Sequence, residues 1–326
     1  MRISYIIDNL SLNIKLLILA LLALIAIAVP TGIYVQSANQ AVFNTALELK
    51  GLHTDDAFFS TLKALQQHRG LASGVLNGNA QQAAELRDKA AEVDKFLASF
   101  RQELASLESA ELNESVKALL AKWAATKGAV NAKTIDAATS FDDHDAVIAD
   151  LNKVLWEASA VSGLWYDPEV ASYHLIVASL DYSPKLIELV AQLRGMGNGV
   201  LVADTLNEKQ HKFLTSNIAN TKVYRENLLL QLVAASNANS DLSVLVTGAK
   251  AQLVAVDELA SLVDQEILST RDLTLDPKSL WSKSTVIIDG LLEFNHSATE
   301  SLHTVMQKRL NRLEKNRNIT VAFLLL

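Results

Sequence analysis

The fold of this chain is decided by the stretch Leu16-Leu-Ile-Leu-Ala-Leu-Leu-Ala-Leu-Ile-Ala-Ile-Ala-Val-Pro-Thr-Gly-Ile-Tyr-Val35, which carries no charged residue. A helix of about twenty residues is about 30 Å long, the thickness of the hydrocarbon core of a bilayer. A single segment can satisfy its backbone there only as a helix. The sequence therefore predicts a transmembrane helix at residues 16–35, and the weak basic excess of residues 1–15 predicts a cytoplasmic N-terminus.

A cleaved secretory signal is the alternative interpretation, because Ala26-Ile-Ala28 resembles a cleavage site. Against it, the apolar run continues to Val35, and the chain ends on a second apolar run at residues 319–326 that follows a basic stretch. Eight residues are too few to cross a bilayer, so we expect this run to be the start of a truncated second transmembrane helix. Residues 36–318 would then form a periplasmic domain.

The composition indicates a helical protein. The chain has 326 residues, of which 50% are hydrophobic, with only four prolines, so it can bury a sizeable core. Its net charge is −7 and its acidic and basic residues are interspersed, which argues against a nucleic-acid-binding surface. It contains no cysteine, which excludes disulfides and thiolate chemistry.

Hydrophobic residues recur at helical spacing along the whole chain. Asp167-Pro168 and Asp276-Pro277 each provide an N-cap followed by a proline at the first helical position, and Pro184 is a possible kink. The polar residues 139–145 read as a loop. We expect helices at about 16–76, 81–107, 112–135, 146–164, 168–203, 207–235, 241–268 and 277–326. These lengths predict an all-α fold of two stacked antiparallel bundles.

One sequence pattern occurs twice, in two segments that are both expected to be helical. Arg69-Gly70-Leu-Ala-Ser-Gly74-Val75-Leu76 and Arg194-Gly195-Met-Gly-Asn-Gly199-Val200-Leu201 share the pattern R-G-x-x-x-G-V-L, 125 residues apart. Duplication of a bundle explains the match. So does convergent packing, because glycines four residues apart let helices approach closely.

The search for catalytic or metal-binding motifs finds none. No phosphate-binding loop occurs, and the glycines after Arg194 lie within a helical pattern with no strand before them. His296 and His303 share one helix face, for which a solvated surface is the favoured interpretation over a metal site. Three aspartates in residues 142–145 lack the glycine and later glutamate of a calcium loop. We expect no enzyme, no cofactor and no metal.

Arg69 and Arg194 are the strongest candidates for a ligand site. Each lies in an apolar helical setting beside glycines that leave space, and the planar guanidinium suits a carboxylate or a nitrate-type oxyanion. The alternative is an arginine that complements the helix dipole and reaches solvent. Tyr173 is a weaker candidate, because it lies about 30 Å from Arg194 along one expected helix.

The chain resembles the sensor half of bacterial transmembrane receptors, in particular methyl-accepting chemotaxis proteins and sensor histidine kinases. The residues that carry the resemblance are Leu12-Asn-Ile-Lys15, Leu65-Gln66-Gln67-His68-Arg69-Gly70 and Asp167-Pro-Glu-Val-Ala-Ser-Tyr173, followed by Ser183-Pro184 and Leu193-Arg194-Gly195. Nitrate- and nitrite-sensing helical domains and bimodular helical domains that bind organic acids are the specific relatives. In the nitrate-sensing pattern a glutamate or arginine commonly precedes the arginine, whereas here His68 precedes Arg69.

The resemblance implies an inner-membrane receptor whose periplasmic domain binds a small anion, nitrate or an organic acid, and signals to cytoplasmic proteins as a homodimer. It adds His68 to Arg69, Arg194 and Tyr173 as ligand-binding candidates. The signalling output is expected to be chemotactic, with a histidine kinase or a diguanylate cyclase as alternatives. A membrane-anchored helical scaffold that binds a protein partner is the rival interpretation.

Overall fold

The computed structural model describes residues 10–324, and every regular element in that range is helical. Residues 1–9 of the predicted cytoplasmic N-terminus and the last two leucines lie outside the described residues. The chain forms two compact units, one of residues 1–46 with 307–326 and one of residues 47–306. The all-α prediction is confirmed.

The smaller unit contains the first part of α2 (Leu12–Leu52) and the last part of α11 (Pro277–Leu324). Within it, residues 16–35 of α2 are apolar on nearly all sides, with Leu17 70% and Leu24 65% exposed. A helix that is hydrophobic all round is typical of burial in a large core or a membrane. Pro30 lies inside α2 without ending it.

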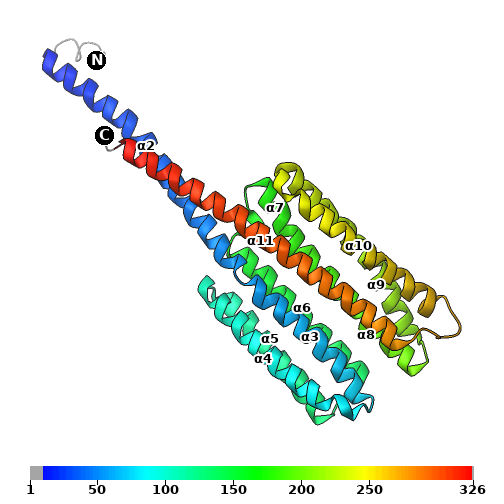
Figure 1. The fold of residues 1–326 in the computed structure, drawn as a ribbon. Helices are drawn as coiled ribbons and strands as arrows, with labels where there is room; N and C mark the ends of the chain where they lie inside the picture. Colours follow the sequence, from blue (N-terminus) through cyan, green and yellow to red (C-terminus); the bar gives the residue numbers. More distant parts are fainter. Residues whose placement is uncertain (1–9, 325–326) are drawn as a thin grey trace. The chain divides into compact units, whose positions relative to one another are not determined.

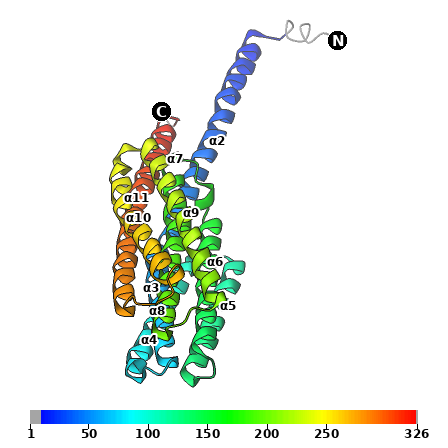
Figure 2. The ribbon, with the colours of Figure 1, turned by 90° about the vertical axis from the view of Figure 1, so that its right-hand side faces the viewer.

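The larger unit contains two antiparallel bundles, each with connections of a few residues (Figures 1 and 2). The first bundle is formed by α3 (Asp55–Leu76), α4 (Ala83–Leu104), α5 (Ala110–Ala132) and α6 (Ala137–Val161). The second is formed by α7 (Val170–Val177), α8 (Ser183–Ala203), α9 (Glu208–Ala238), α10 (Ser243–Val263) and α11. The bundles pack side by side, with α3 against α8.

Helix starts follow the local capping chemistry. Ser109 accepts a hydrogen bond from the Leu112 amide at 3.2 Å, and Asn207 and Gln210 form a reciprocal capping box. The Asp276 carboxylate accepts from the Ser279 amide at 3.0 Å, so α11 begins with Pro277 at its first position, as Asp276-Pro277 predicts. At Asp167-Pro168 the prediction is wrong by two residues, because Glu169 is the N-cap of α7.

Three other predictions about the helices need correction. The first helix is not unbroken to residue 76, because α2 ends at Leu52 and the Thr54 hydroxyl donates to the Gly51 carbonyl at 2.8 Å before α3 begins. The predicted loop at 139–145 is helical, since Asp136 caps the Thr139 amide at 2.8 Å and the helix dipole favours acidic residues in the first turns. The interruption before Pro184 is a π-helical turn, Ala178–Tyr182.

Two helical stretches are long and apolar enough to cross a membrane. One is Leu12–Leu76, whose most apolar window has a mean hydropathy of 2.8 and is 0% buried. The other is Val170–Ala203, with a mean hydropathy of 1.2 in a window that is 61% buried. Burial identifies the second as a core helix of the bundles, so the membrane prediction rests on residues 16–35.

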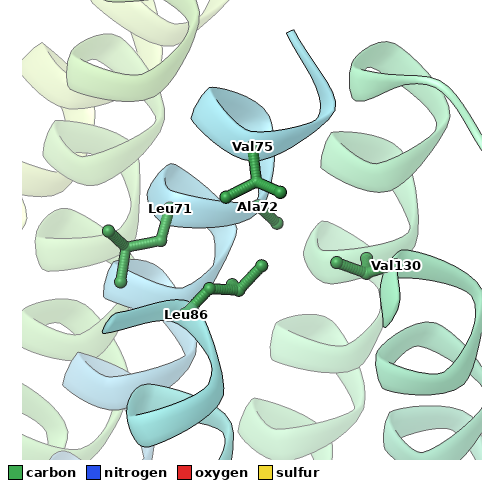
Figure 3. Close-up of a cluster of buried hydrophobic side chains, with 5 residues drawn as sticks. All are labelled: Leu71, Ala72, Val75, Leu86 and Val130. Atoms are coloured by element: carbon green, nitrogen blue, oxygen red, sulfur yellow. The ribbon is translucent and has the colours of Figure 1, made fainter. Parts of the chain in front are cut away.

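The core of the first bundle includes a cluster of buried aliphatic side chains from three helices (Figure 3). Leu71, Ala72 and Val75 extend from α3, Leu86 from α4 and Val130 from α5. Interiors are packed close to crystal density, so a cavity made here is filled only in part by relaxation. The cluster joins the ends of three helices near the turn that follows α3.

Replacing Leu86, which is 3% exposed, with alanine should lower the free energy of unfolding by about 2 to 5 kcal/mol. Leu230→Ala is the matched control, because that side chain is 61% exposed, and it should change stability by less than about 0.5 kcal/mol. Urea unfolding of the purified chain in detergent, followed by circular dichroism, measures both. Equal losses would contradict the packing described for the cluster.

Candidate functional site

A cavity of about 610 Å³ lies where α3 and α8 meet the start of α11. Its lining includes Arg69, Gly70, Phe141, Gly195 and Trp281. The repeated Arg-Gly segments of α3 and α8 therefore meet at one place, as a shared ligand site requires. Polar residues complete the lining, among them Asn77, Asn79, Asn198, Asp276 and Lys278.

The two Arg-Gly pairs contact their surroundings in the same way. The Arg69 guanidinium lies 4.8 Å from the centre of the Phe141 ring, and that ring covers Gly195, where a Cβ would lie 3.0 Å from Phe141 Cε2. The Arg194 guanidinium lies 4.5 Å from the centre of the Trp281 ring, and that ring covers Gly70 so closely that a Cβ would overlap it. Each arginine thus stacks on the ring that covers the glycine beside the other arginine.

The correspondence extends one helical turn further. Arg69 Nη1 donates to Asp145, four residues after Phe141, and Arg194 Nη1 donates to the Thr285 hydroxyl at 3.0 Å, four residues after Trp281. The two copies thus match in the arginine, the glycine, the ring and the acceptor. This agreement favours duplication of an ancestral bundle over coincidence. The copies differ in the acceptor, which is a carboxylate beside Arg69 and a neutral hydroxyl beside Arg194.

Arg69 is 2% exposed, and its positive charge is paired with two carboxylates. Its Nη1 donates to Asp145 Oδ1 and also to Glu188 Oε1, the latter at 2.6 Å. Burial alone would lower the pKa of Arg69, but the two carboxylates outweigh it and raise the pKa. For Asp145, burial outweighs the attraction of Arg69 and, with the neighbouring charge of Glu188, raises the pKa to about 7.

Arg194 is 3% exposed, and its polar partner among the described residues is a hydroxyl rather than a carboxylate. Burial, followed by the positive charge of Arg69, lowers the pKa of Arg194 to about 10, so it stays charged at neutral pH. Its Nε has no hydrogen-bond partner within residues 10–324, and neither has Arg69 Nη2. A buried donor without an acceptor is costly, so both arginines are suited to an anion.

Amides hold the two carboxylates in place. Gln66 Nε2 donates to Glu188 Oε2 at 2.8 Å, and Gln192 Nε2 donates to Asp145 Oδ2 at 3.1 Å. Asn217 from α9 in turn donates to Gln192 Oε1 at 2.8 Å. The network draws on α3, α6, α8 and α9, so the charges around Arg69 are held from both bundles.

His68 lies behind Arg69 and does not line the cavity. Its Nδ1 is 2.7 Å from His144 Nε2, and His144 Nδ1 donates to the Ser140 carbonyl at 2.6 Å. Burial lowers the pKa of His68 to about 3 and that of His144 to about 4, so both rings are neutral at physiological pH. The pair supports the helix contact between α3 and α6.

Tyr173 is 39% exposed at the start of α7, where its ring packs edge-on against His174, and it does not line the cavity. Of the four candidates, only Arg69 lines the cavity, and Arg194 reaches it through the Trp281 ring on which it stacks. Within the described residues, no group of three metal-ligating side chains lies together. The two histidines weighed as metal ligands contact aspartates of α3 instead: His296 lies 3.4 Å from Asp56 and His303 lies 3.9 Å from Asp55.

Sequence reasoning missed five residues of this site: Phe141, Asp145, Glu188, Trp281 and Thr285. A signal was present, because aromatic and acceptor are four residues apart in both copies, and residues i and i+4 lie on one helix face. The rings are 140 residues apart while the arginines are 125 apart, so a search at one fixed period does not align them. Glu188 has no counterpart signal in the repeated pattern.

Gly70→Ala should destabilise the chain by about 1 to 3 kcal/mol, because the new methyl group overlaps the Trp281 ring. Gly128→Ala is the control: a Cβ there meets nothing within 4 Å, so alanine should gain up to about 1 kcal/mol through helix propensity. Thermal unfolding of both variants gives the comparison. In the double variant Gly70→Ala/Trp281→Leu the loss of stability should be smaller than the sum of the losses in the two single variants. Strict additivity would rule out the contact between position 70 and the Trp281 ring.

Comparison with solved structures finds the NasR transcription antiterminator, at 16% sequence identity and a TM-score of 0.53. The alignment covers 88% of this chain and 74% of that one. At this identity the likeness supports the helical fold alone. No curated protein matches.

A family model described as nitrate and nitrite sensing matches residues 60–303. The match covers about three quarters of the chain and includes both arginines, the rings on which they stack and the acceptors to which they donate. The chain belongs to the nitrate- and nitrite-sensing family of signalling sensor domains.

Proposed function

We propose that the chain is the sensor region of a bacterial inner-membrane receptor for nitrate or nitrite, and that the anion binds between Arg69 and Arg194. The observation that carries the proposal is a pair of buried guanidinium groups, each with an N–H donor that has no partner among the described residues. Arg69 lines the cavity, and Arg194 stacks on the Trp281 ring, which also lines it. Planar oxyanions match the planar donor fork of arginine. Family membership supports an anion of this class.

The charges favour an anion over a neutral ligand. Arg194 has a hydroxyl where Arg69 has a carboxylate, so its charge is not balanced by an ion pair among residues 10–324. An anion would give Arg194 a direct ion-pair partner and relieve the repulsion that Arg69 exerts on Arg194. The cavity, at about 610 Å³, is large enough to hold nitrate with water or a small organic acid.

Arg194→Gln should weaken nitrate binding by roughly 10- to 150-fold, because a charge-assisted hydrogen bond contributes about 1.5 to 3 kcal/mol. Arg225→Gln removes a partly exposed arginine that pairs with Asp257 and contacts neither Phe141 nor Trp281, and it should bind as the parent does. Isothermal titration with nitrate, nitrite, acetate and succinate tests both variants.

Unchanged affinity in folded Arg194→Gln would remove Arg194 from the site. Binding of succinate but neither nitrate nor nitrite would favour the bimodular, organic-acid type of sensor. If none of the four anions binds the parent, the scaffold interpretation is favoured.

The membrane topology is part of the same proposal. Residues 1–15 are cytoplasmic, 16–35 span the membrane, 36–318 form the periplasmic sensor domain and 319–326 begin a second membrane helix. The receptor acts as a homodimer and passes the signal to cytoplasmic signalling proteins, by a chemotaxis-type output or, alternatively, through a histidine kinase or diguanylate cyclase. Packed helices relay ligand binding as shifts of about 1 to 2 Å.

An alkaline phosphatase fusion at about Asn239, in the turn between α9 and α10, should be active, and a reporter that fluoresces only in the cytoplasm should be dark there. The basic residues Lys308, Arg309, Arg312, Lys315 and Arg317 oppose this orientation by the positive-inside rule, so the test is decisive. The reverse result would place the domain in the cytoplasm and refute the receptor topology.

A further inference from the structure

We propose that Asp145 is the internal counter-ion of the site and that an anion enters together with a proton, which neutralises Asp145. The inference rests on the proposed anion site and names a residue that controls it. Its starting point is geometric: two carboxylates, Asp145 and Glu188, converge on a single nitrogen, Arg69 Nη1. Two carboxylates that share one site cannot both ionise freely, so one of them takes up a proton readily.

The charge balance gives the proton its role. Arg69 and Arg194 contribute two positive charges, and Asp145 and Glu188 contribute two negative charges, so the ionised site is neutral. A monovalent anion would leave one negative charge in excess in a buried place. A proton on Asp145 restores neutrality and frees part of the Arg69 charge for the anion.

Asp145 is better placed than Glu188 to exchange this proton. The side chain of Asp145 is 21% exposed and that of Glu188 is 11% exposed. Burial and the adjacent Glu188 already raise the pKa of Asp145 to about 7. The second copy of the bundle has Thr285 in the matching position, where a neutral acceptor serves Arg194 without any charge. Protonation makes Asp145 resemble Thr285, a neutral group that can donate and accept.

The other charged groups around Asp145 are paired or neutral. Asp142, one turn earlier on α6, pairs with Lys209 of α9 at 2.8 Å, and Lys63 of α3 pairs with Asp289 of α11 at 2.9 Å. His144 of α6 and His68 of α3 are neutral above about pH 4. Glu188, Arg194 and Arg69 are the charges counted above, and the opposite charges of Asp276 and Lys278 in the cavity wall cancel. Between pH 7 and 8.5 a proton on Asp145 is therefore the change expected on anion binding.

The sign of the pH effect follows from linkage. Below about pH 7 Asp145 already holds its proton, so nitrate affinity should be nearly constant. Above pH 7 the proton must be taken up on binding, so the dissociation constant should rise, approaching tenfold per pH unit. In titrations with buffers of different ionisation enthalpy, about one proton should be taken up per nitrate at pH 8.5.

The test titrates nitrate into the full chain in detergent at pH 6, 7, 8 and 8.5. Asp145→Asn should bind at pH 8.5 as tightly as the parent binds at pH 6, with no pH dependence and no proton uptake. Asp142→Asn, on the same helix but in an exposed ion pair, should keep a pH dependence like that of the parent, with its midpoint at lower pH because the charge of Asp142 helps to raise the pKa of Asp145. If Asp145→Asn impairs folding, Asp145→Thr provides an independent variant, because threonine is the residue at the matching position beside Arg194.

Each outcome bears on a different statement. Nitrate binding by the parent without pH dependence would overturn the role of Asp145 and leave the anion site intact. Loss of pH dependence in Glu188→Gln but not in Asp145→Asn would assign the proton to Glu188 and overturn the proposal. No binding of nitrate at any pH would overturn the proposed function, and this inference with it.

Discussion

The burial of one positive charge between two bundles governs this structure. Arg69 lies almost without solvent exposure on α3, and its carboxylate partners come from α6 of its own bundle and α8 of the other. Removing one partner from such a group leaves charges that are both buried and unpaired, which costs several kcal/mol. The ion pair to Glu188 therefore fixes how α3 lies against α8, and the amides of Gln66 and Gln192 restrict the same contact further.

The balance of charges also separates the two halves of the cavity. Arg69 has its counter-ions built into the protein, whereas Arg194 has only a hydroxyl from the described residues. A duplicated bundle would begin with two equal halves. The difference between Asp145 and Thr285 makes one half satisfied by the protein and leaves the other to a ligand, which suits a sensor that must remain folded when its ligand is absent.

Much of the fold could be predicted because it is encoded locally. Helical periodicity located the helices of both bundles, and the Asp276-Pro277 start of α11 follows from capping alone. The errors at Thr54 and at residues 139–145 have one cause: side-chain oxygens decide whether a polar stretch caps, continues or interrupts a helix. Composition shows that such oxygens are present but not which amide or carbonyl they contact.

The site could be predicted only in part. The repeated Arg-Gly pattern identified two segments that meet at one cavity, because glycine next to a long cation is visible in the sequence. Their burial, the ring beneath each guanidinium and the carboxylates beside Arg69 depend on residues 72 to 119 positions away. No single-sequence signal links residues at such separations, so the sequence could not distinguish an anion site from a solvated arginine.

The exchange of rings between the bundles constrains how this family can change. Phe141 of the first bundle covers a glycine of the second, and Trp281 of the second covers a glycine of the first. A larger ring on one side or a side chain at either glycine is tolerated only if the other bundle changes as well, so effects of mutations on the two halves should not add. The two bundles are therefore tied by reciprocal epistasis, and exchanging one of them for an unrelated bundle would remove the contacts at Gly70 and Gly195.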